Sequence, residues 1–184
     1  MKRLIVGLLF TSTCVLSANA ADSVFLDGKN SFGVGVYNEN VLYWNRNGAS
    51  NNHEAEFVGW VAKYTRNFNS YHQLSALYFD SKGGPHYLNG YKITYQVGYN
   101  LDKNGLGIYT GLSYANKTIV ELGADRKLNK KMRDSYEIPI GIQVQNDDAI
   151  LSLDIVIDSN NMSTDELGID NITPPITITY SIKF

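Results

Sequence analysis

The sequence contains almost no cysteine. The single cysteine is Cys14, which falls within the first twenty residues. The rest of the chain therefore has no disulfide framework, and other interactions must stabilise its fold. Thr11, Ser12 and Thr13 precede the cysteine, and this is not the small-residue pattern that a lipid-modified cysteine requires. Lipidation is therefore not expected.

Long hydrophobic runs are also missing. After residue 20, no apolar run reaches the length of about 18 residues that a membrane-spanning helix needs. Every backbone polar group inside a bilayer must be hydrogen-bonded within the protein, which only helices and closed barrels achieve. If the chain after residue 20 spans a membrane, it must do so as a closed β-barrel.

The first twenty residues have the features of a secretory signal peptide. Lys2 and Arg3 are followed by an apolar run from residue 4 to residue 10, and Ala18-Asn19-Ala20 forms a cleavage site. We therefore expect a signal peptide at 1–20 and one domain at 21–184. Cleavage removes Lys2 and Arg3, which changes the formal charge from −2 to −4. An acidic exported chain is not expected to bind nucleic acid.

The end of the chain alternates strictly between apolar and polar residues. One parity holds Ile176, Ile178, Tyr180, Ile182 and Phe184; the other holds Thr177, Thr179, Ser181 and Lys183. Successive side chains of a β-strand point to opposite faces, so this pattern predicts a strand with one apolar and one polar face.

The same alternation recurs seven more times. It is clear at 91–99, 106–114, 135–145 and 149–158, and weaker at 32–43, 58–64 and 74–78. We expect a bulge at 38–40 to restore the parity of the first strand, and another at Pro139, which lacks a backbone donor. The total is eight strands of about ten residues each, the length of a tilted strand that crosses a membrane.

The expected connections alternate between short and long. The short ones lie at 67–70, 102–105 and 146–148, and the long ones at 46–53, 80–87, 116–132 and 158–174. This arrangement is typical of an even-stranded barrel with turns at one end and loops at the other. The predicted fold is all-β, an eight-stranded antiparallel up-and-down transmembrane β-barrel. A soluble lipocalin-like barrel would alternate too, but the polar face here carries glycine, threonine, serine and glutamine, which suit a crowded interior better than a solvated surface.

These features resemble the small eight-stranded outer-membrane proteins, namely the OmpA transmembrane domain, OmpX and the opacity-protein group. The resemblance implies insertion in a Gram-negative outer membrane. In that class the last strand is similar to the signal read by the barrel-assembly machinery, and Tyr180, Ile182 and Phe184 match it.

Six charged residues fall on the polar parity of the expected strands and should enter the barrel. They are Glu39, Lys63, Lys92, Glu137, Asp154 and Lys183. An eight-stranded barrel is just wide enough for side chains to fill it, and unpaired buried charges are costly. We expect a salt-bridged, hydrogen-bonded plug; a proton or ion path is the alternative.

Charged residues of each sign gather in the two last expected loops. The third loop and its border carry Arg126, Lys127, Lys130, Lys131 and Arg133, and the fourth carries Asp158, Asp165, Glu166 and Asp170. The basic group could bind lipopolysaccharide phosphates or could be a solvated loop. The acidic group could contact the basic one or a divalent cation, but its spacing matches no calcium loop, so we expect no metal site.

No catalytic residue is assigned. An outer-membrane lipid A hydrolase or acyltransferase would need a histidine with a serine or carboxylate partner. His86, with Asp80 and Ser81, is at the appropriate end of the expected barrel, but it lies in a glycine-rich turn. His72 and Ser75 have opposite parity and should not pair.

The sequence thus predicts a non-enzymatic, monomeric outer-membrane barrel without a cofactor. Its expected role is envelope integrity or surface interaction, such as adhesion or contact with a host factor or lipopolysaccharide through extracellular loops. The expected partners are membrane lipid, lipopolysaccharide and, during insertion, the barrel-assembly machinery. A lipid A-modifying enzyme, a soluble periplasmic lipocalin-like carrier and a small channel are the alternatives.

Overall fold

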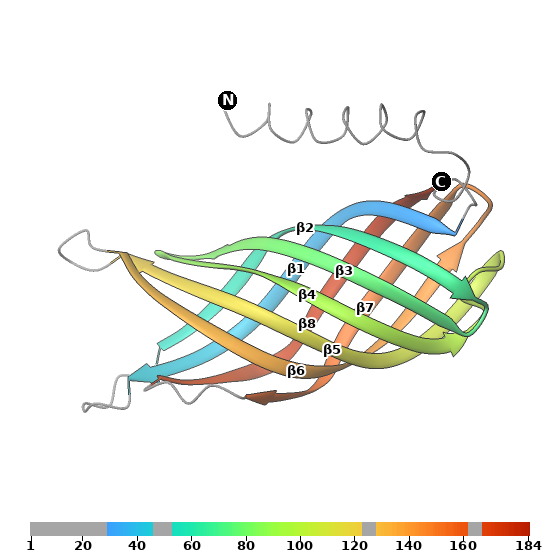
Figure 1. The fold of residues 1–184 in the computed structure, drawn as a ribbon. Coiled ribbons are helices and arrows are strands. Elements are labelled where there is room, and N and C mark those ends of the chain that lie inside the picture. The colour runs from blue at the N-terminus through green and yellow to red at the C-terminus, as the bar shows by residue number, and fades with distance from the viewer. Residues whose placement is uncertain (1–28, 46–52, 123–127, 162–166) are drawn as a thin grey trace, which may run out of the picture.

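The computed structural model describes residues 29–45, 53–122, 128–161 and 167–184, which form eight β-strands (Figure 1). The strands are β1 (Asn30–Asn45), β2 (His53–Asn69), β3 (His72–Gly83), β4 (His86–Tyr99), β5 (Gly105–Leu122), β6 (Leu128–Gln145), β7 (Ala149–Asn161) and β8 (Leu167–Lys183). The side chains of 42–54, 121–133 and 158–172 are outside the described set. The expected signal peptide at 1–20 also lies outside the described residues.

The strands close into one antiparallel barrel in chain order. β1 pairs with β8 in the register Ser31 opposite Lys183, and Asn30 and Phe184 exchange backbone hydrogen bonds of 3.3 and 2.9 Å. This pairing of the last strand with the one that begins near Ser31 confirms the predicted closure and fold class. We call the end that holds Asn30 and Phe184 the turn end and the opposite one the loop end. No helix among the described residues is long and apolar enough to cross a membrane.

The strands are longer than predicted, and the loop-end connections are correspondingly shorter. The strands have 12 to 18 residues, whereas about ten were expected. β5 and β6 continue through most of the expected loop at 116–132, and β3 and β4 are joined by residues 84–85 alone. The predicted strict alternation of short and long connections is therefore wrong. Apolar residues alternate with polar ones only in the middle of each strand, whereas backbone pairing between the strands continues beyond that segment.

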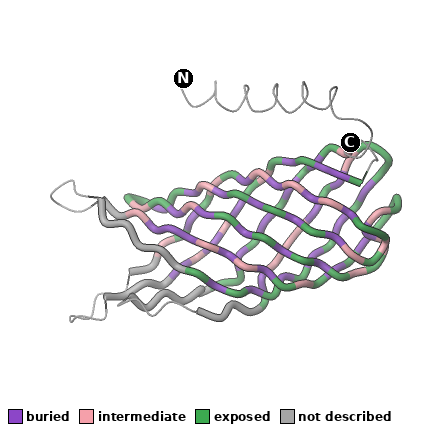
Figure 2. Tube along the Cα trace, viewed as in Figure 1, coloured by how far each residue is buried: buried purple, intermediate pink, exposed green. Residues whose placement is uncertain are grey.

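Buried and exposed residues alternate along most of the described part of every strand (Figure 2). The residues predicted to share the apolar face of the last strand all point outward: Ile176, Ile178, Tyr180 and Ile182 are between 39% and 60% exposed. Their polar neighbours Thr177, Thr179 and Ser181 are buried inside the barrel. The exterior is therefore the apolar face, the reverse of a water-soluble barrel.

Register shifts occur at both predicted bulge positions, but the one at 38–40 does not restore the parity of the first strand as expected. A register shift separates Ile138 from Pro139 where β6 pairs with β7, as the missing proline donor predicts. By contrast, β1 remains regular against β2 through residues 38–40. The irregularity there belongs to the pairing with β8, which carries Pro174 and Pro175. The parity of β1 therefore persists, and Val41 points inward, with 1% of its surface exposed.

The ladder between β7 and β8 is incomplete at the loop end. Its last pair is Ile155 with Ile176. Beyond it, β7 continues alongside β6 as far as Asn161, and β8 continues alongside β1 as far as Leu167. We call this feature the β7–β8 split. Pro174 and Pro175 follow at once on the β8 side, and proline cannot donate to a ladder.

Candidate functional site

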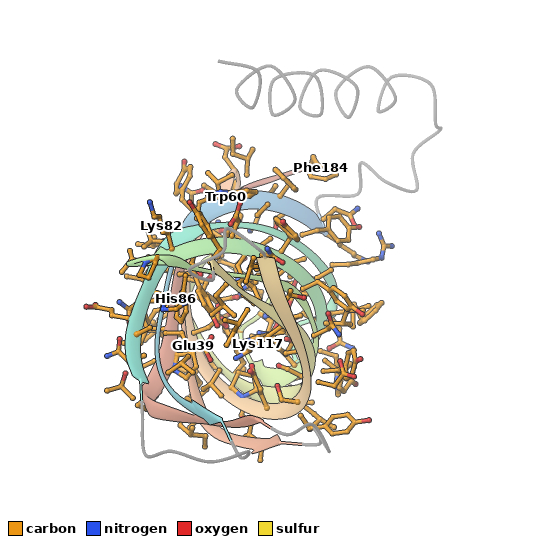
Figure 3. All side chains as sticks on the ribbon, turned by 90° about the vertical axis from the view of Figure 1, so that its left-hand side faces the viewer. Glu39, Trp60, Lys82, His86, Lys117 and Phe184 are labelled. Atoms are coloured by element: carbon orange, nitrogen blue, oxygen red, sulfur yellow. The ribbon has the colours of Figure 1, made fainter. Side chains whose placement is uncertain are left out.

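The barrel interior holds a chain of four buried charges. The ammonium of Lys117 on β5 lies 2.7 Å from Glu39 on β1 and 2.8 Å from Glu137 on β6. Glu137 also lies 2.6 Å from Lys92 on β4. Figure 3, viewed from the loop end, shows Glu39 and Lys117 pointing toward one another within the barrel. Strands that are distant in sequence are thus connected across the interior.

The positive and negative charges of this chain are equal in number, and its side chains are almost inaccessible to water. Two lysines face two glutamates, and Tyr37 donates its hydroxyl hydrogen to the second oxygen of Glu39. Both glutamate side chains have at most 1% of their surface exposed. A buried carboxylate that lost its partner would keep its desolvation cost without the compensating attraction, so each member depends on the others. We call Glu39, Lys92, Lys117 and Glu137 the central ion network.

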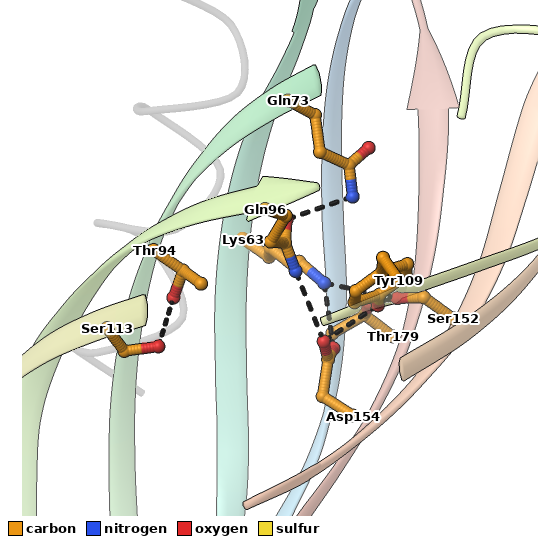
Figure 4. Close-up of polar contacts among 9 residues, drawn as sticks. All are labelled: Lys63, Gln73, Thr94, Gln96, Tyr109, Ser113, Ser152, Asp154 and Thr179. Carbon is orange, nitrogen blue, oxygen red and sulfur yellow. Dashed lines mark hydrogen bonds and ion pairs between the residues drawn. The ribbon is translucent and has the colours of Figure 1, made fainter. Parts of the chain in front are cut away.

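A second polar cluster surrounds Asp154 (Figure 4). Lys63 lies 2.8 Å from one of its oxygens, and Tyr109 donates a 2.7 Å hydrogen bond to the other. Lys63 also donates to Ser152 at 3.3 Å, and Gln96 lies 3.5 Å from Asp154. These residues come from β2, β4, β5 and β7, so they connect opposite sides of the wall.

Gly141 makes the position of Tyr109 possible. A β-carbon added at Gly141 would lie 2.1 Å from Cε2 of the Tyr109 ring, far inside van der Waals contact. Tyr109 is the facing residue on β5. Glycine at 141 therefore lets the ring turn across the interior and reach Asp154.

The turn end is closed by the connection between β4 and β5. Leu101 in this connection is fully buried, and its amide donates to the Ser70 carbonyl at 2.9 Å. Gln143 donates to the Leu101 carbonyl at 3.0 Å, and Gln145 donates to the Asn100 carbonyl at 3.1 Å. A buried apolar side chain therefore lies at this mouth, on a connection that is held by hydrogen bonds to its backbone.

Toward the loop end the interior also holds an apolar cluster beside Glu39 and Lys117, which the sequence did not predict. The core cluster consists of Tyr37, Val41, Phe57, Val61, Leu77, Phe79, Leu88 and Ile119. The rings of Tyr37 and Phe79 stack at 4.4 Å between centroids. The signal was present in the sequence, because these strands hold apolar residues on both parities, as in Leu77-Tyr78-Phe79. By parity alone, such segments are indistinguishable from strands with imperfect alternation.

The structure brings together five of the six charged residues expected inside. Glu39, Lys92 and Glu137 belong to the central ion network, and Lys63 and Asp154 form the second cluster. Lys183 is separate: it lies at the turn end and donates to the Asn146 carbonyl at 2.6 Å. Lys117 was missed because it was assigned to the loop at 116–132, although it lies on the inward parity of β5.

The expected loop clusters are not located as predicted. Arg126 and Lys127 lie outside the described residues, whereas Lys130, Lys131 and Arg133 belong to the backbone of β6. They therefore do not share one loop. Of the acidic group, Asp165 and Glu166 lie outside the described residues, and Asp158 and Asp170 belong to β7 and β8. No metal-ligating group of three was found among the described residues.

The residues considered for a hydrolase site do not all lie on one face of the barrel wall. Ser81 points inward and donates its hydroxyl to the Leu88 carbonyl at 2.8 Å, whereas Asp80 lies on the opposite parity of β3. The two candidate partners of His86 therefore occupy different faces of the wall. His72 lies on the outside, where Nδ1 is 2.8 Å from the Tyr95 hydroxyl. Ser75 points inward, as its parity predicted.

The outer surface carries a row of aromatic side chains on consecutive strands. Trp60 on β2 and Tyr78 on β3 are 5.6 Å apart, and Tyr114 on β5 lies 6.3 Å from Tyr91 on β4 and 6.0 Å from Tyr136 on β6. Tyr78 and Tyr91 are directly paired. We call these five residues the aromatic row. Toward the loop end, it is followed by an outward polar collar that comprises Asn38, Glu56, Asp80, Lys82, Asn89, Asn116 and Asp134.

Comparison with known proteins shows the fold of this chain. No family model matches the sequence, and no curated protein matches it. Neisserial surface protein A has a TM-score of 0.56 at 10% identity, over 83% of this chain and 97% of its own. Ail, the attachment invasion locus protein of Yersinia pestis, solved in complex with the heparin analogue sucrose octasulfate, has a TM-score of 0.53 at 10% identity, over 84% and 97%. The resemblance to small eight-stranded outer-membrane barrels is thereby confirmed at the level of the fold.

Proposed function

We propose that this protein is a non-enzymatic, integral outer-membrane barrel that acts in envelope integrity or in surface interaction. A single observation carries the proposal: a closed hydrogen-bonded barrel presents apolar side chains to its surroundings on every strand. Examples from opposite sides of the wall are Val34, Trp60, Ile93, Ile140 and Ile178, which are each between 45% and 59% exposed.

Only a hydrocarbon environment stabilises such an exterior. A monomeric soluble protein rarely exposes a contiguous apolar patch larger than a few hundred Å². Here the apolar surface encircles the barrel, whereas charged groups are paired within it. The closed ladder also satisfies the backbone in the middle of the wall, as a bilayer requires. A soluble lipocalin-like carrier has the opposite distribution and is disfavoured.

The proposed orientation places the turn end in the periplasm and the loop end outside the cell. A signal peptide at 1–20 would deliver the chain for export, and the chain would span the membrane as a monomer. Tyr180, Ile182 and Phe184 line the outward face of β8 as it ends, where the barrel-assembly machinery would recognise them during insertion.

Surface contact would be made by the strand extensions and the loop-end connections. The β5–β6 hairpin carries Arg126, Lys127, Lys130, Lys131 and Arg133, which could bind phosphate or sulfate groups. Lipopolysaccharide carries phosphate groups, and the heparin analogue in the Ail structure is a sulfated ligand of a protein of similar fold. We propose this hairpin as the principal contact of the protein.

Cell fractionation tests the membrane assignment. We expect the protein in detergent-extracted outer membrane, with a faster gel migration before heating than after, because the folded barrel resists the detergent. Release of the protein by osmotic shock would contradict the proposal. Binding of cells to immobilised heparin tests the surface role, with the five basic residues changed to glutamine; binding that is unaffected by these changes would exclude the hairpin.

The enzymatic alternative has its own test. The Ser81 hydroxyl donates to the Leu88 carbonyl, and Asp80 lies on the opposite face of the wall, so we propose no hydrolase centred on His86. Lipid A from cells with and without the protein should therefore have the same mass. A mass difference that His86→Ala abolishes would overturn this part of the proposal.

A further inference from the structure

A carboxylate is held on the outer wall at the boundary between the aromatic row and the polar collar. Asp134 on β6 is exposed, and its Oδ1 accepts two hydrogen bonds from β5. One comes from the Tyr114 hydroxyl at 2.9 Å and the other from the Asn116 side-chain amide at 2.6 Å. Both donors are neutral, so the negative charge is fixed in position without being cancelled by them.

Three tyrosines lie near this carboxylate on three neighbouring strands. Asn116 pairs with Asp134 on one side and with Tyr91 on the other, and Tyr114 pairs with Tyr136 one step closer to the turn end. The rings of Tyr114 and Tyr136 meet edge to face at 60°, and those of Tyr91 and Tyr114 are tilted by 52°. Tyr91 and Tyr136 are each more than 40% exposed. The patch therefore offers aromatic surface beside one anchored anion.

The chemistry of this patch selects a cation. Aromatic faces attract cations, most strongly where water is excluded, and a carboxylate adds direct charge attraction. A phosphate or sulfate would be repelled by Asp134. A divalent metal prefers several oxygen ligands, at least some of them charged, whereas the neighbours of this carboxylate are an amide nitrogen and phenols. An ammonium group, by contrast, needs one anion and apolar or aromatic surroundings.

The position on the wall identifies where such a cation would come from. The aromatic row lies where the apolar band ends, and aromatic side chains of membrane proteins gather at the level of the lipid headgroups. We propose that Asp134, Asn116 and the tyrosines at 91, 114 and 136 form a binding site for an ammonium group, carried by a lipid headgroup or by a free amine. This site, the ammonium patch, requires the membrane placement proposed above.

Glu56 supplies a matched comparison within the same collar. It is an exposed carboxylate that accepts a 3.0 Å hydrogen bond from Asn38, but it lies on β2, outside the group of three tyrosines. Neutralisation of either carboxylate removes one negative charge from the collar. If general attraction by the collar were responsible for binding, the two changes would have equal effects. If the ammonium patch binds the cation, only the change at Asp134 should weaken binding.

The test uses the refolded full-length barrel in dodecyl maltoside micelles. The probes are dihexanoyl phosphatidylethanolamine, phosphatidylcholine and phosphatidylglycerol, together with free ethanolamine and choline, and binding is followed by NMR shifts of the Asn116 side-chain amide. We expect the two ammonium lipids to bind about fivefold more tightly than the glycerol lipid, in keeping with a modest cation–aromatic contribution. Binding of the free amines would identify soluble amines as a second source; binding of the lipids alone would restrict the site to headgroups.

Variants decide whether the patch is responsible. Asp134→Asn retains an acceptor for Tyr114 and Asn116 and should abolish the preference, while Glu56→Gln should preserve it. Tyr136→Leu should weaken binding of phosphatidylcholine in particular, whose quaternary ammonium cannot donate hydrogen bonds. Equal binding of all three lipids by the unmodified protein, or equal losses in Asp134→Asn and Glu56→Gln, would overturn the proposal. A barrel that inserts normally yet shows no preference refutes the ammonium patch alone; failure to insert refutes the proposed function.

Discussion

The ammonium of Lys117 lies 2.8 Å from the carboxylate of Glu137, on neighbouring strands and out of contact with water. Because Glu39 lies on the other side of the same ammonium, one lysine separates two buried carboxylates. The central ion network is therefore most vulnerable at Lys117.

Lys117→Met should lower the free energy of unfolding by roughly 3–5 kcal/mol, because two buried carboxylates lose their shared cation. Urea titration of the refolded barrel, followed by the heat-modifiable gel shift, measures this change. Lys103→Met, at an exposed lysine of the β4–β5 connection, is the control. Adding Glu39→Gln to Lys117→Met should recover part of the loss. Equal urea midpoints for Lys117→Met and the control would show that the network does not stabilise the barrel.

Gly141→Ala should destabilise the barrel by roughly 1–3 kcal/mol, because the new methyl group collides with the ring of Tyr109. Tyr109→Leu removes the ring that causes the collision, so the double variant should lose less than the sum of the two single losses. Thermal unfolding of all four proteins gives the coupling. Strictly additive losses would mean that Gly141 is required for a reason other than the ring.

Backbone amides of β7 within the β7–β8 split (156–161) should exchange with solvent faster than those of 149–155. Residues 149–155 have hydrogen-bonded neighbours on both sides, whereas 156–161 are paired only with β6. Hydrogen exchange followed by mass spectrometry compares the two segments. Replacement of Pro174 and Pro175 by threonine supplies two donors and should slow exchange at 156–161. Uniform protection along β7 would show that the ladder continues.

Ile178→Arg should weaken membrane insertion by roughly 2–4 kcal/mol, because Ile178 points outward in the middle of the apolar band. Folding into lipid vesicles under urea titration measures the loss. Asn89→Arg, in the polar collar, places the same charge nearer the loop end and should cost much less. If the two variants lose equal stability, the apolar band does not mark the hydrocarbon layer.

Phe184→Ala should reduce assembly in cells while leaving refolding in detergent almost unchanged. The backbone of Phe184 already pairs with Asn30, and its ring is partly exposed, so the ring adds little to the folded barrel. The ratio of folded to unfolded protein in purified outer membranes measures assembly. Phe68→Ala, another exposed aromatic residue near the turn end, serves as the control. Equal assembly of both variants would exclude Phe184 from the recognition signal.

The number, order and closure of the strands could be predicted from the sequence, because each strand has to place its apolar parity outward. The ends of the strands could not. Lys117 was assigned to a loop, because beyond the apolar band both faces of a hairpin are polar and parity no longer identifies a strand. Lys117 belongs to β5 because its backbone pairs with that of Arg133 on β6. Such backbone pairing leaves no pattern in the side chains.

The sequence predicted the polar residues of the interior but not its apolar cluster. Lys63 and Asp154 were expected inside, but which charges would meet depended on registers between distant strands that sequence parity does not specify. Tyr37 and Phe79 were missed, since two apolar faces on one strand obscure the alternation. The ammonium patch was missed as well: Asp134 and Tyr91 are 43 positions apart in the sequence and become neighbours only through the ladders of β4, β5 and β6.

The pairing of Ser31 with Lys183 also determines when this molecule can fold. These two positions are about 150 residues apart in the sequence, so the ring stays open until β8 is available to pair with β1. A product shortened by even one strand retains two unpaired edges, and unpaired edges are sites of aggregation. Loss of β8 alone should therefore be as damaging as loss of an earlier strand.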